Sequence, residues 1–383
     1  MQTMHPSIML GSYVWLQDRL PVDEFRLRID DINAQMDAHG WKGLLVYGDA
    51  REHAALAYVS NFIPRMRWGM ALLSRDGNHR LLCSMSTRDL PAMRTMTWIP
   101  DVHSGWEWEK TFDPWLQHFK SNTATEFGTV GFDLMASPLQ ASVDKSIGGH
   151  VRLNRADEIL GLPQARKRPR EVSMIRAACR VVETAAKAFA EGWRASGSPE
   201  TGALQGERAA RAMAAQDVRT LVSLNGGRTL VPFKGEFASI PGPLVGYIAV
   251  KLAGYWADML VTAGEPVTAA ALACDAALAQ MAAAARPGVR MSHLHAVAAG
   301  ALKPLQLHPI LEGSVGRGIG LSLHEGPEFD DNEAAVLEEG GVYALQVGVA
   351  DPQAGYALKS AVVYVRAAGV DVLTRSAPSV SGG

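Results

Sequence analysis

The chain has 383 residues, and its 37 Lys and Arg nearly balance 39 Asp and Glu, leaving a formal net charge of −2. Nucleic acids and anionic membrane surfaces attract proteins with a basic excess, so neither is an expected partner. With 48% apolar and 20% charged residues, the composition is that of a folded protein, and the length predicts two domains. No run of about 18 apolar residues occurs, so we expect no membrane span.

The cysteines indicate a reducing compartment. Cys83, Cys179 and Cys274 are odd in number, lie far apart and form no C-x-x-C pair. Disulfides persist mainly in oxidising compartments. We therefore expect free thiols and a cytoplasmic location.

In the first half of the chain, helical patterns alternate with strand patterns. Apolar residues at helical spacing predict a helix over 23–40 that ends at a glycine, and the apolar run GLLVYGD at 43–49 predicts a buried strand. Two apolar runs around Asp76-Gly77 predict a hairpin, and residues 128–134 predict another strand. We expect an α/β domain over residues 1–158.

The second half opens with a helical pattern over 170–193 and a second one over 201–216. Strand-like runs follow, then an alanine-rich helix over 268–285 that stops at Pro287-Gly288, then further strand-like runs. This order predicts an α+β domain over 159–376, with an antiparallel sheet covered by helices. Residues 377–383 predict a disordered tail.

Five segments of the second half, in order, resemble the creatinase/methionine-aminopeptidase family (M24), whose fold is called pita-bread. One of them, GRGIGLSLHEGPEF, resembles the family's G-H-G-I-G-x-x-x-H-E-x-P signature, and residues 48–62 resemble the N-terminal domain of creatinases and prolidases. The other four segments are 167–183, 254–266, 282–294 and 337–349. The resemblance implies an α+β chain: a creatinase-like N-terminal α/β domain followed by a pita-bread domain.

Metal-dependent members of this family carry five ligands: two Asp, one His and two Glu. Asp258 matches the second Asp, but the other four positions carry Tyr247, Arg317, Gln346 and Lys359. Divalent metals such as zinc need several anionic or imidazole donors, and protonated Arg and Lys offer no lone pair. We therefore expect no metal site and no other cofactor.

The resemblance also implies roles for these residues. His324 matches a histidine that handles substrate protons, which suits a side chain with a pKa near neutrality; the alternative is a hydrogen-bonded strand histidine. Asp258 either orients a water or forms a salt bridge with Arg317 or Lys359. Together these three residues carry one surplus positive charge, which either Glu325 or Glu328 or an anionic substrate would balance. Lys359 acting as a base would need a desolvated setting.

Other candidates concern substrate binding. Gln346 is a candidate for holding a substrate carbonyl, and Tyr247 for packing beside it. Phe233 replaces a histidine that creatinase uses, which predicts an apolar portion of the substrate. Residues 60–70 resemble a loop that, in creatinase-like dimers, reaches the neighbouring subunit's site and grips a carboxylate; the alternative is a solvated surface loop. The candidates in this loop are Arg65, Arg67 and Trp68.

Creatinase is itself metal-free, so the resemblance implies a metal-independent hydrolase of a C–N bond, amide-like or amidine, in a small carboxylate-bearing compound. Three alternatives remain open: a lyase or decarboxylase that uses the same cations, a non-catalytic binding protein derived from M24 peptidases, and a metal-dependent Xaa-Pro-type peptidase. The expected partners are a small anionic molecule and a second copy of the chain in a homodimer.

Overall fold

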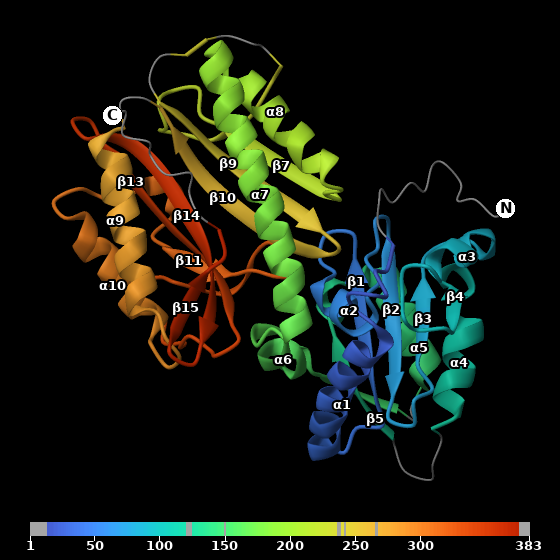
Figure 1. Ribbon diagram of the computed structural model, residues 1–383. Helices are drawn as coiled ribbons and strands as arrows, with labels where there is room; N and C mark the ends of the chain where they lie inside the picture. Colours follow the sequence, from blue (N-terminus) through green and yellow to red (C-terminus); the bar gives the residue numbers. More distant parts are fainter. Residues whose placement is uncertain are drawn as a thin grey trace. The chain divides into compact units, whose positions relative to one another are not determined.

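The computed structural model describes residues 14–119, 125–148, 151–235, 239–240, 243–264 and 267–374. The chain forms two compact units, Met1–Gln164 and Ala165–Gly383, each with its own sheets and helices (Figure 1). The sequence places the boundary near residue 158, and the division in the structure falls at Gln164. The tail predicted for residues 377–383 lies outside the described residues.

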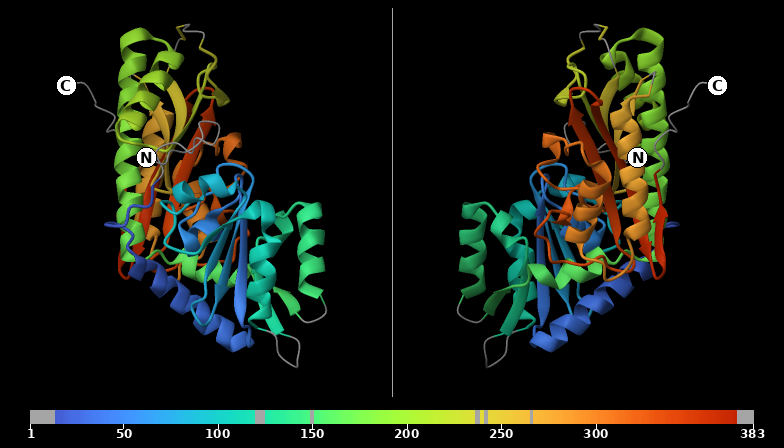
Figure 2. Two further views of the ribbon diagram at one scale, coloured as in Figure 1. Left: turned by 90° about the vertical axis from the view of Figure 1, so that its right-hand side faces the viewer. Right: turned by 90° about the vertical axis from the view of Figure 1, so that its left-hand side faces the viewer.

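The first unit is built on a six-stranded sheet with the strand order β4-β3-β2-β1-β5-β6. Strand β1 runs antiparallel to β2 and parallel to β5. Helices α1 and α2 lie on one face of the sheet, and α4 and α5 lie on the other (Figure 2). The elements are α1 (Val22–His39), β1 (Gly43–Asp49), α2 (Ala54–Ser60), β2 (Trp68–Ser74), β3 (Arg80–Cys83), α3 (Leu90–Met93), β4 (Val102–Ser104), α4 (Glu109–Gln117), β5 (Thr125–Val130), α5 (Ser137–Ile147) and β6 (Val151–Arg155).

The helix, the buried strand and the hairpin predicted for this unit are all present. Helix α1 ends where Gly40 takes the left-handed conformation, φ 73°, in which glycine is not strained. The predicted strand at 128–134 needs correction: β5 begins at Thr125 and stops at Val130. There Gly131, also at φ 73°, turns the chain into a short 3₁₀ turn.

The second unit contains two antiparallel sheets, with the strand orders β10-β9-β7-β8 and β12-β11-β13-β14-β15. This confirms the α+β class and the pita-bread-like arrangement. The strands are β7 (Asp217–Val222), β8 (Val231–Pro232), β9 (Leu244–Leu252), β10 (Tyr255–Ala263), β11 (Gly316–Gly318), β12 (Glu325–Glu328), β13 (Val342–Asp351), β14 (Gly355–Arg366) and β15 (Gly369–Val372).

Two pairs of helices cover the sheets of this unit. Helices α7 and α8 pack on the first sheet, where a side chain at Gly246 would collide with Phe189 of α7. Helices α9 and α10 pack on the second sheet, and α9 stops before Pro287, as predicted. The helices of the unit are α7 (Pro169–Ser196), α8 (Pro199–Ala212), α9 (Ala269–Ala284) and α10 (Met291–Leu302), and α6 (Gly161–Ala165) spans the division between the two units.

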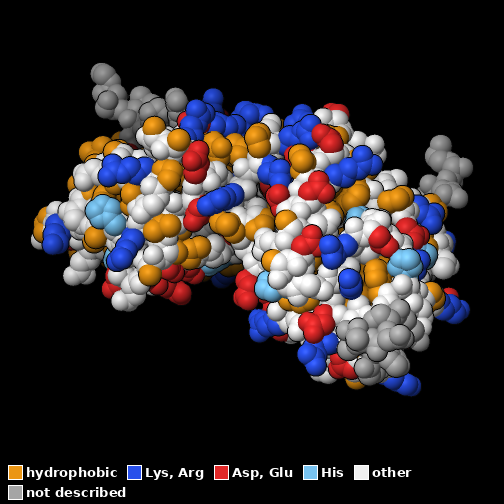
Figure 3. Space-filling view, turned by 90° about the horizontal axis from the view of Figure 1, so that it is seen from below, with side chains coloured by type: hydrophobic (Ala, Val, Ile, Leu, Met, Phe, Trp, Pro, Cys, Tyr) orange, Lys and Arg blue, Asp and Glu red, His pale blue; other side chains and the backbone are white. Residues whose placement is uncertain are grey.

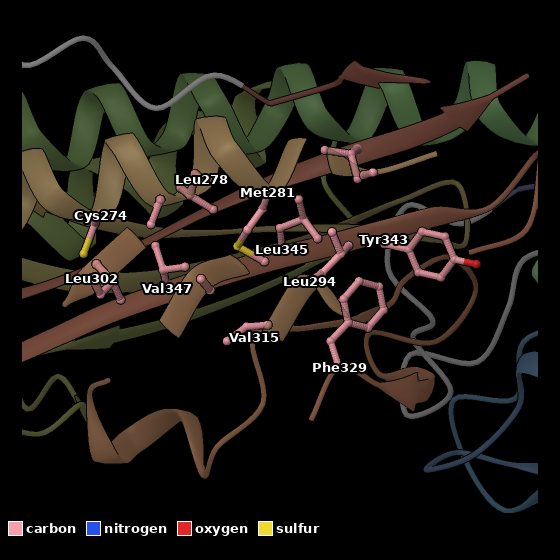
Figure 4. Close-up of a cluster of buried hydrophobic side chains, with 14 of the residues drawn as sticks. Cys274, Leu278, Met281, Leu294, Leu302, Val315, Phe329, Tyr343, Leu345 and Val347 are labelled. Carbon is pink, nitrogen blue, oxygen red and sulfur yellow. The ribbon is translucent and has the colours of Figure 1, made fainter. Parts of the chain in front are cut away.

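The second sheet uses one face for its hydrophobic core. Figure 4 shows Cys274 and Met281 of α9 and Leu294 of α10 against Leu345 and Val347 of β13, all of them buried. The opposite face meets the first sheet. Leu260 donates its N–H to Ser360 Oγ at 2.8 Å, and Thr262 Oγ1 donates to the carbonyl of Leu358 at 3.0 Å. Polar side chains on the facing surfaces of the two sheets are therefore brought close together.

The surface is mixed in charge. On the face drawn in Figure 3, Lys and Arg side chains are interspersed with Asp and Glu. None of the helices in the described part of the chain combines the length and apolar character that a membrane span requires.

Candidate functional site

Four of the predicted site residues meet between the two sheets of the second unit. Tyr247 of β9 and Asp258 of β10 come from the first sheet, and Arg317 of β11 and Gln346 of β13 come from the second. We call these four residues the Asp258 cluster. In the register, Asp258 lies opposite Ala249, two residues from Tyr247, and Arg317 lies opposite Ala344, two residues from Gln346. Residues two apart on a strand share a face, so each pair points into the same space.

Arg317 is held on three sides. Its Nη2 donates to Asp258 Oδ2 in a short ion pair, and its Nη1 donates to Gln346 Oε1 at 2.9 Å. Its Nε donates to the carbonyl of Leu323 at 3.3 Å. The Arg317 side chain is 11% exposed and that of Asp258 is 3% exposed, so both charges are removed from water. The guanidinium of Arg317, which Gly316 and Gly318 flank in the sequence, thus binds the one carboxylate that remains of the family's ligands.

The cluster is electrically neutral. Tyr247 donates its hydroxyl to Asp258 Oδ2 at 3.0 Å. Burial raises the pKa of Tyr247 well above its usual value, and the Asp258 carboxylate raises it further. Burial lowers the pKa of Arg317, but the carboxylate beside it outweighs this effect and the net shift is upward. Tyr247 is therefore a neutral donor, and Arg317 remains a cation that balances Asp258.

One acceptor in the cluster is left over. Asp258 Oδ1 is buried and has no hydrogen-bond partner among the residues that the structure describes. A buried acceptor without a donor costs about 1–3 kcal/mol. The arrangement thus holds a carboxylate through Oδ2 and leaves Oδ1 able to accept a hydrogen bond from a water or a ligand.

The role expected for Lys359 in this site was wrong. Lys359 lies opposite Val347 on the face of the sheet that α9 covers, and its Nζ pairs with Asp275 Oδ2 of α9 at 2.5 Å. The residue opposite Gln346 is Ser360. Ser360, not Lys359, is therefore the residue of β14 that shares a face with Gln346. The surplus positive charge expected for the site disappears with this correction.

His324 lies in the bend before β12 and does not form part of a strand. Its side chain is 58% exposed, and Nε2 lies 2.9 Å from Glu328 Oε1. Glu328 is opposite Arg317 in the register of β11 and β12, so His324 is connected to the rim of the Asp258 cluster through Glu328. Its accessibility fits a proton carrier, and an exposed pair of this kind adds little to stability.

Glu325 has a structural partner that the sequence did not reveal. Lys167, just before α7, is 6% exposed, and its Nζ lies 2.6 Å from Glu325 Oε2. A side chain at Gly320 would come within 2.9 Å of Nζ, so this glycine makes room for the pair. Of the two carboxylates proposed to balance Arg317, Glu325 is therefore engaged elsewhere.

The remaining predicted residues do not join the cluster. Phe233 follows β8 and is half-buried. In the first unit, Trp68 begins β2 and stacks on Tyr47 at 6.2 Å between ring centroids. Arg67 takes a left-handed conformation, φ 56°, and lies 5.9 Å from the ring of Trp106. Arg65 belongs to the same loop. Their predicted contact with a neighbouring subunit remains a prediction.

The residues of the site do not fit a pair of divalent metals. Of the five ligand positions only Asp258 supplies a carboxylate, and a guanidinium is bonded to it. Two other positions offer the Tyr247 hydroxyl and the Gln346 amide, and Lys359 at the last position pairs with Asp275 on the opposite face of the sheet. Across the described residues, no three His, Cys, Asp or Glu side chains come together as they would around an ion. A metal would have to displace Arg317 from its buried carboxylate.

Comparisons with known proteins agree on one family. A sequence model of the metallopeptidase family M24 matches residues 173–367, just over half of the chain. A curated relative from Bacillus subtilis (strain 168), "Putative dipeptidase YkvY", is 32% identical over 72 residues, which cover 19% of this chain and only 20% of the relative.

Two solved structures share the fold over almost their whole length. The X-Pro aminopeptidase of Thermotoga maritima MSB8 has a TM-score of 0.76 at 17% identity, covering 91% of this chain and 97% of its own. The N-terminal domain of the FACT complex subunit SPT16 from Cicer arietinum has a TM-score of 0.64 at 13% identity, covering 93% and 97%. At these identities the likeness establishes the fold.

Proposed function

The chain belongs to the metallopeptidase family M24, and we propose that it hydrolyses a C–N bond, amide-like or amidine, in a small carboxylate-bearing compound without a metal. One observation carries the metal-independent part of this proposal. The guanidinium of Arg317 is bonded to Asp258 and Gln346, two of the positions from which relatives would bind metal. The protonated guanidinium therefore occupies the position where a metal ion would bind, and it has no lone pair with which to coordinate a metal.

The proposed reaction uses the buried carboxylate to orient water. A water that donates to Asp258 Oδ1 directs its oxygen lone pair at the carbon of the C–N bond. As the C–O bond forms, the water transfers that proton to Asp258 Oδ1 and the C–N bond breaks; the proton on Asp258 is released to solvent after the amine has left. His324, which is exposed and paired with Glu328, delivers a proton to the leaving nitrogen. Arg317 and Tyr247 keep Asp258 ionised and fixed, since both donate to Oδ2.

A second candidate is a non-catalytic binding protein. The ion pair of Arg317 and Asp258 neutralises itself in a water-poor setting, which needs no substrate to balance it. The N-terminal domain of a FACT complex subunit has the same fold, and in this candidate the cleft of the chain recognises a ligand or partner without catalysis.

A metal-dependent peptidase is the third candidate, because the names of several relatives are those of peptidases. This candidate requires metal in the protein.

The experiment that separates the candidates is a hydrolysis screen in the presence of a chelator. N-acylated amino acids, amidino acids and Xaa-Pro dipeptides would be incubated with the protein in EDTA, and free amine would be measured. We expect turnover of an N-acyl or amidino acid that falls strongly in Asp258→Asn and His324→Ala. Turnover that requires added metal supports the peptidase, and no turnover of any class supports the binding protein.

Three further features belong to the proposal. The substrate-binding set comprises Gln346 and Phe233 in the second unit, together with Arg65, Arg67 and Trp68 contributed across a homodimer. Light scattering of the purified chain tests the dimer. The cysteines Cys83, Cys179 and Cys274 are buried thiols, which fits the cytoplasmic location that we propose.

A further inference from the structure

The inner surface of the first sheet carries an arginine in line with Asp258. Arg219 of β7 lies opposite Ala249 of β9, and Ala249 lies opposite Asp258 of β10. Residues directly opposite each other in antiparallel strands share a face, so Arg219 and Asp258 face the same side with a small residue between them. Two strand spacings separate their Cα atoms by about 10 Å.

Arg219 is held in place but retains its donors. Its guanidinium lies over the ring of Trp256, 4.6 Å from the centroid, with Lys251 Nζ at 5.3 Å from the same ring. Arg219 forms an ion pair with Asp217, whose Oδ2 lies 3.6 Å from Nη2, a distance too long for a hydrogen bond. Within the described part of the chain the guanidinium makes no hydrogen bond, and the side chain is 57% exposed. A planar cation fixed on an aromatic ring is ready to bind a carboxylate with two parallel bonds.

The two cations expected beside Asp258, Arg317 and Lys359, are unsuited to binding the substrate carboxylate. Each nitrogen of the Arg317 guanidinium already donates one hydrogen bond, to the Leu323 carbonyl, Gln346 or Asp258. Lys359 points toward α9. On the face that carries Asp258, Arg219 makes no hydrogen bond within the described part of the chain, and it lies two residues from Leu221, which is opposite Tyr247.

We propose that Arg219, supported by Trp256, binds the carboxylate of the substrate, and that the substrate is therefore a short N-acylated amino acid. The assignment rests on the proposed function. A carboxylate bound at Arg219 and a C–N bond held at Asp258 lie on neighbouring positions of one sheet face. N-acyl derivatives of glycine and β-alanine are the simplest compounds that carry both groups.

The test is a titration of the full-length protein, in EDTA, with N-acetylglycine and N-acetyl-β-alanine by isothermal calorimetry. Arg219→Gln removes the charge and keeps a polar side chain of similar reach. Arg208→Gln, on the exposed surface of α8, is the matched control. We expect at least one probe to bind the wild type and the control equally and to bind Arg219→Gln at least about tenfold more weakly. N-acetylglycinamide, which lacks the carboxylate, should bind all three proteins with the same weak affinity.

Two results would overturn the assignment: equal affinity of wild type and Arg219→Gln for the acids, or no binding of either acid to the wild type. Hydrolysis of the probes is measured separately. Arg219-dependent binding without hydrolysis refutes the proposed hydrolase and leaves Arg219 as the anion site of a binding protein. Hydrolysis that is indifferent to Arg219 refutes only this assignment.

Discussion

Replacing Arg317 by Met should strongly destabilise the second unit. Asp258 has a side chain that is 3% exposed, and the substitution removes the charge bonded to its Oδ2. Tyr247 would remain as a donor, at 3.0 Å. Removing one partner of a buried ion pair costs about 3–5 kcal/mol, because the other charge stays buried and unpaired. We expect a loss of that size in the free energy of unfolding.

Urea unfolding followed by circular dichroism, together with hydrogen exchange of amides in β10 and β13, measures this loss in the second unit. Arg366→Met is the matched control: it breaks an exposed pair with Asp371 on the same sheet, where the Arg side chain is 60% exposed, and should cost less than about 1 kcal/mol. In Arg317→Met/Asp258→Leu the orphaned charge is gone, so most of the stability should return. If Arg317→Met costs no more than the control, the buried pair is not what stabilises the site.

Two further predictions concern the metal positions and acid stability. Restoring the family's ligands should create a divalent-metal site only when the last Glu is placed at position 360, because Ser360 shares a face with Gln346 and Lys359 does not. In calorimetry, Tyr247→Asp/Arg317→His/Gln346→Glu/Ser360→Glu should bind Mn²⁺, and the same protein with Lys359→Glu in place of Ser360→Glu should bind it much more weakly. Equal binding by the two proteins would contradict the placement of Ser360 on the face of the site. The pKa of Asp76 is lowered to about 2, chiefly by the hydrogen bond from Ser74, so its stabilising effect is present above its unfolded pKa of about 3.9 and is lost as pH falls toward 2. Asp76→Asn should flatten the fall in melting temperature over that pH range, and an unchanged slope would contradict this.

The sequence predicted the fold well because the motifs that carry it are local. The Gly40 helix end, the hairpin at Asp76-Gly77 and the helix stop at Pro287 each depend on the backbone preferences of a few residues. The five ordered resemblances then fixed the family.

The error at Lys359 shows that the sequence does not determine which face of a fully buried strand a residue occupies. Strand β14 is buried on both faces, by α9 on one side and by the first sheet on the other, so apolar residues do not alternate along it. Without this alternation, the sequence does not indicate whether Lys359 or Ser360 faces the site. The register with β13 decides it, and register is a long-range property.

Partners distant in sequence were also beyond prediction. Lys167 and Glu325 are separated by 158 positions, and Arg219 reaches Trp256 only because β7 and β10 flank β9. An isolated Lys or Arg in the sequence usually indicates a solvated surface. The signal that the sequence did contain was the arginine in place of the ligand histidine, which predicted a changed site.

The most direct test of the account is the metal content of the purified protein. The chain would be incubated with Mn²⁺, Co²⁺ and Zn²⁺, freed of unbound metal by gel filtration, and analysed by inductively coupled plasma mass spectrometry, with Arg317→His alongside. Because Arg317 is bonded to the Asp258 carboxylate, we predict far less than one ion per chain in the wild type. About two ions per chain would contradict the account and identify a metal-dependent enzyme.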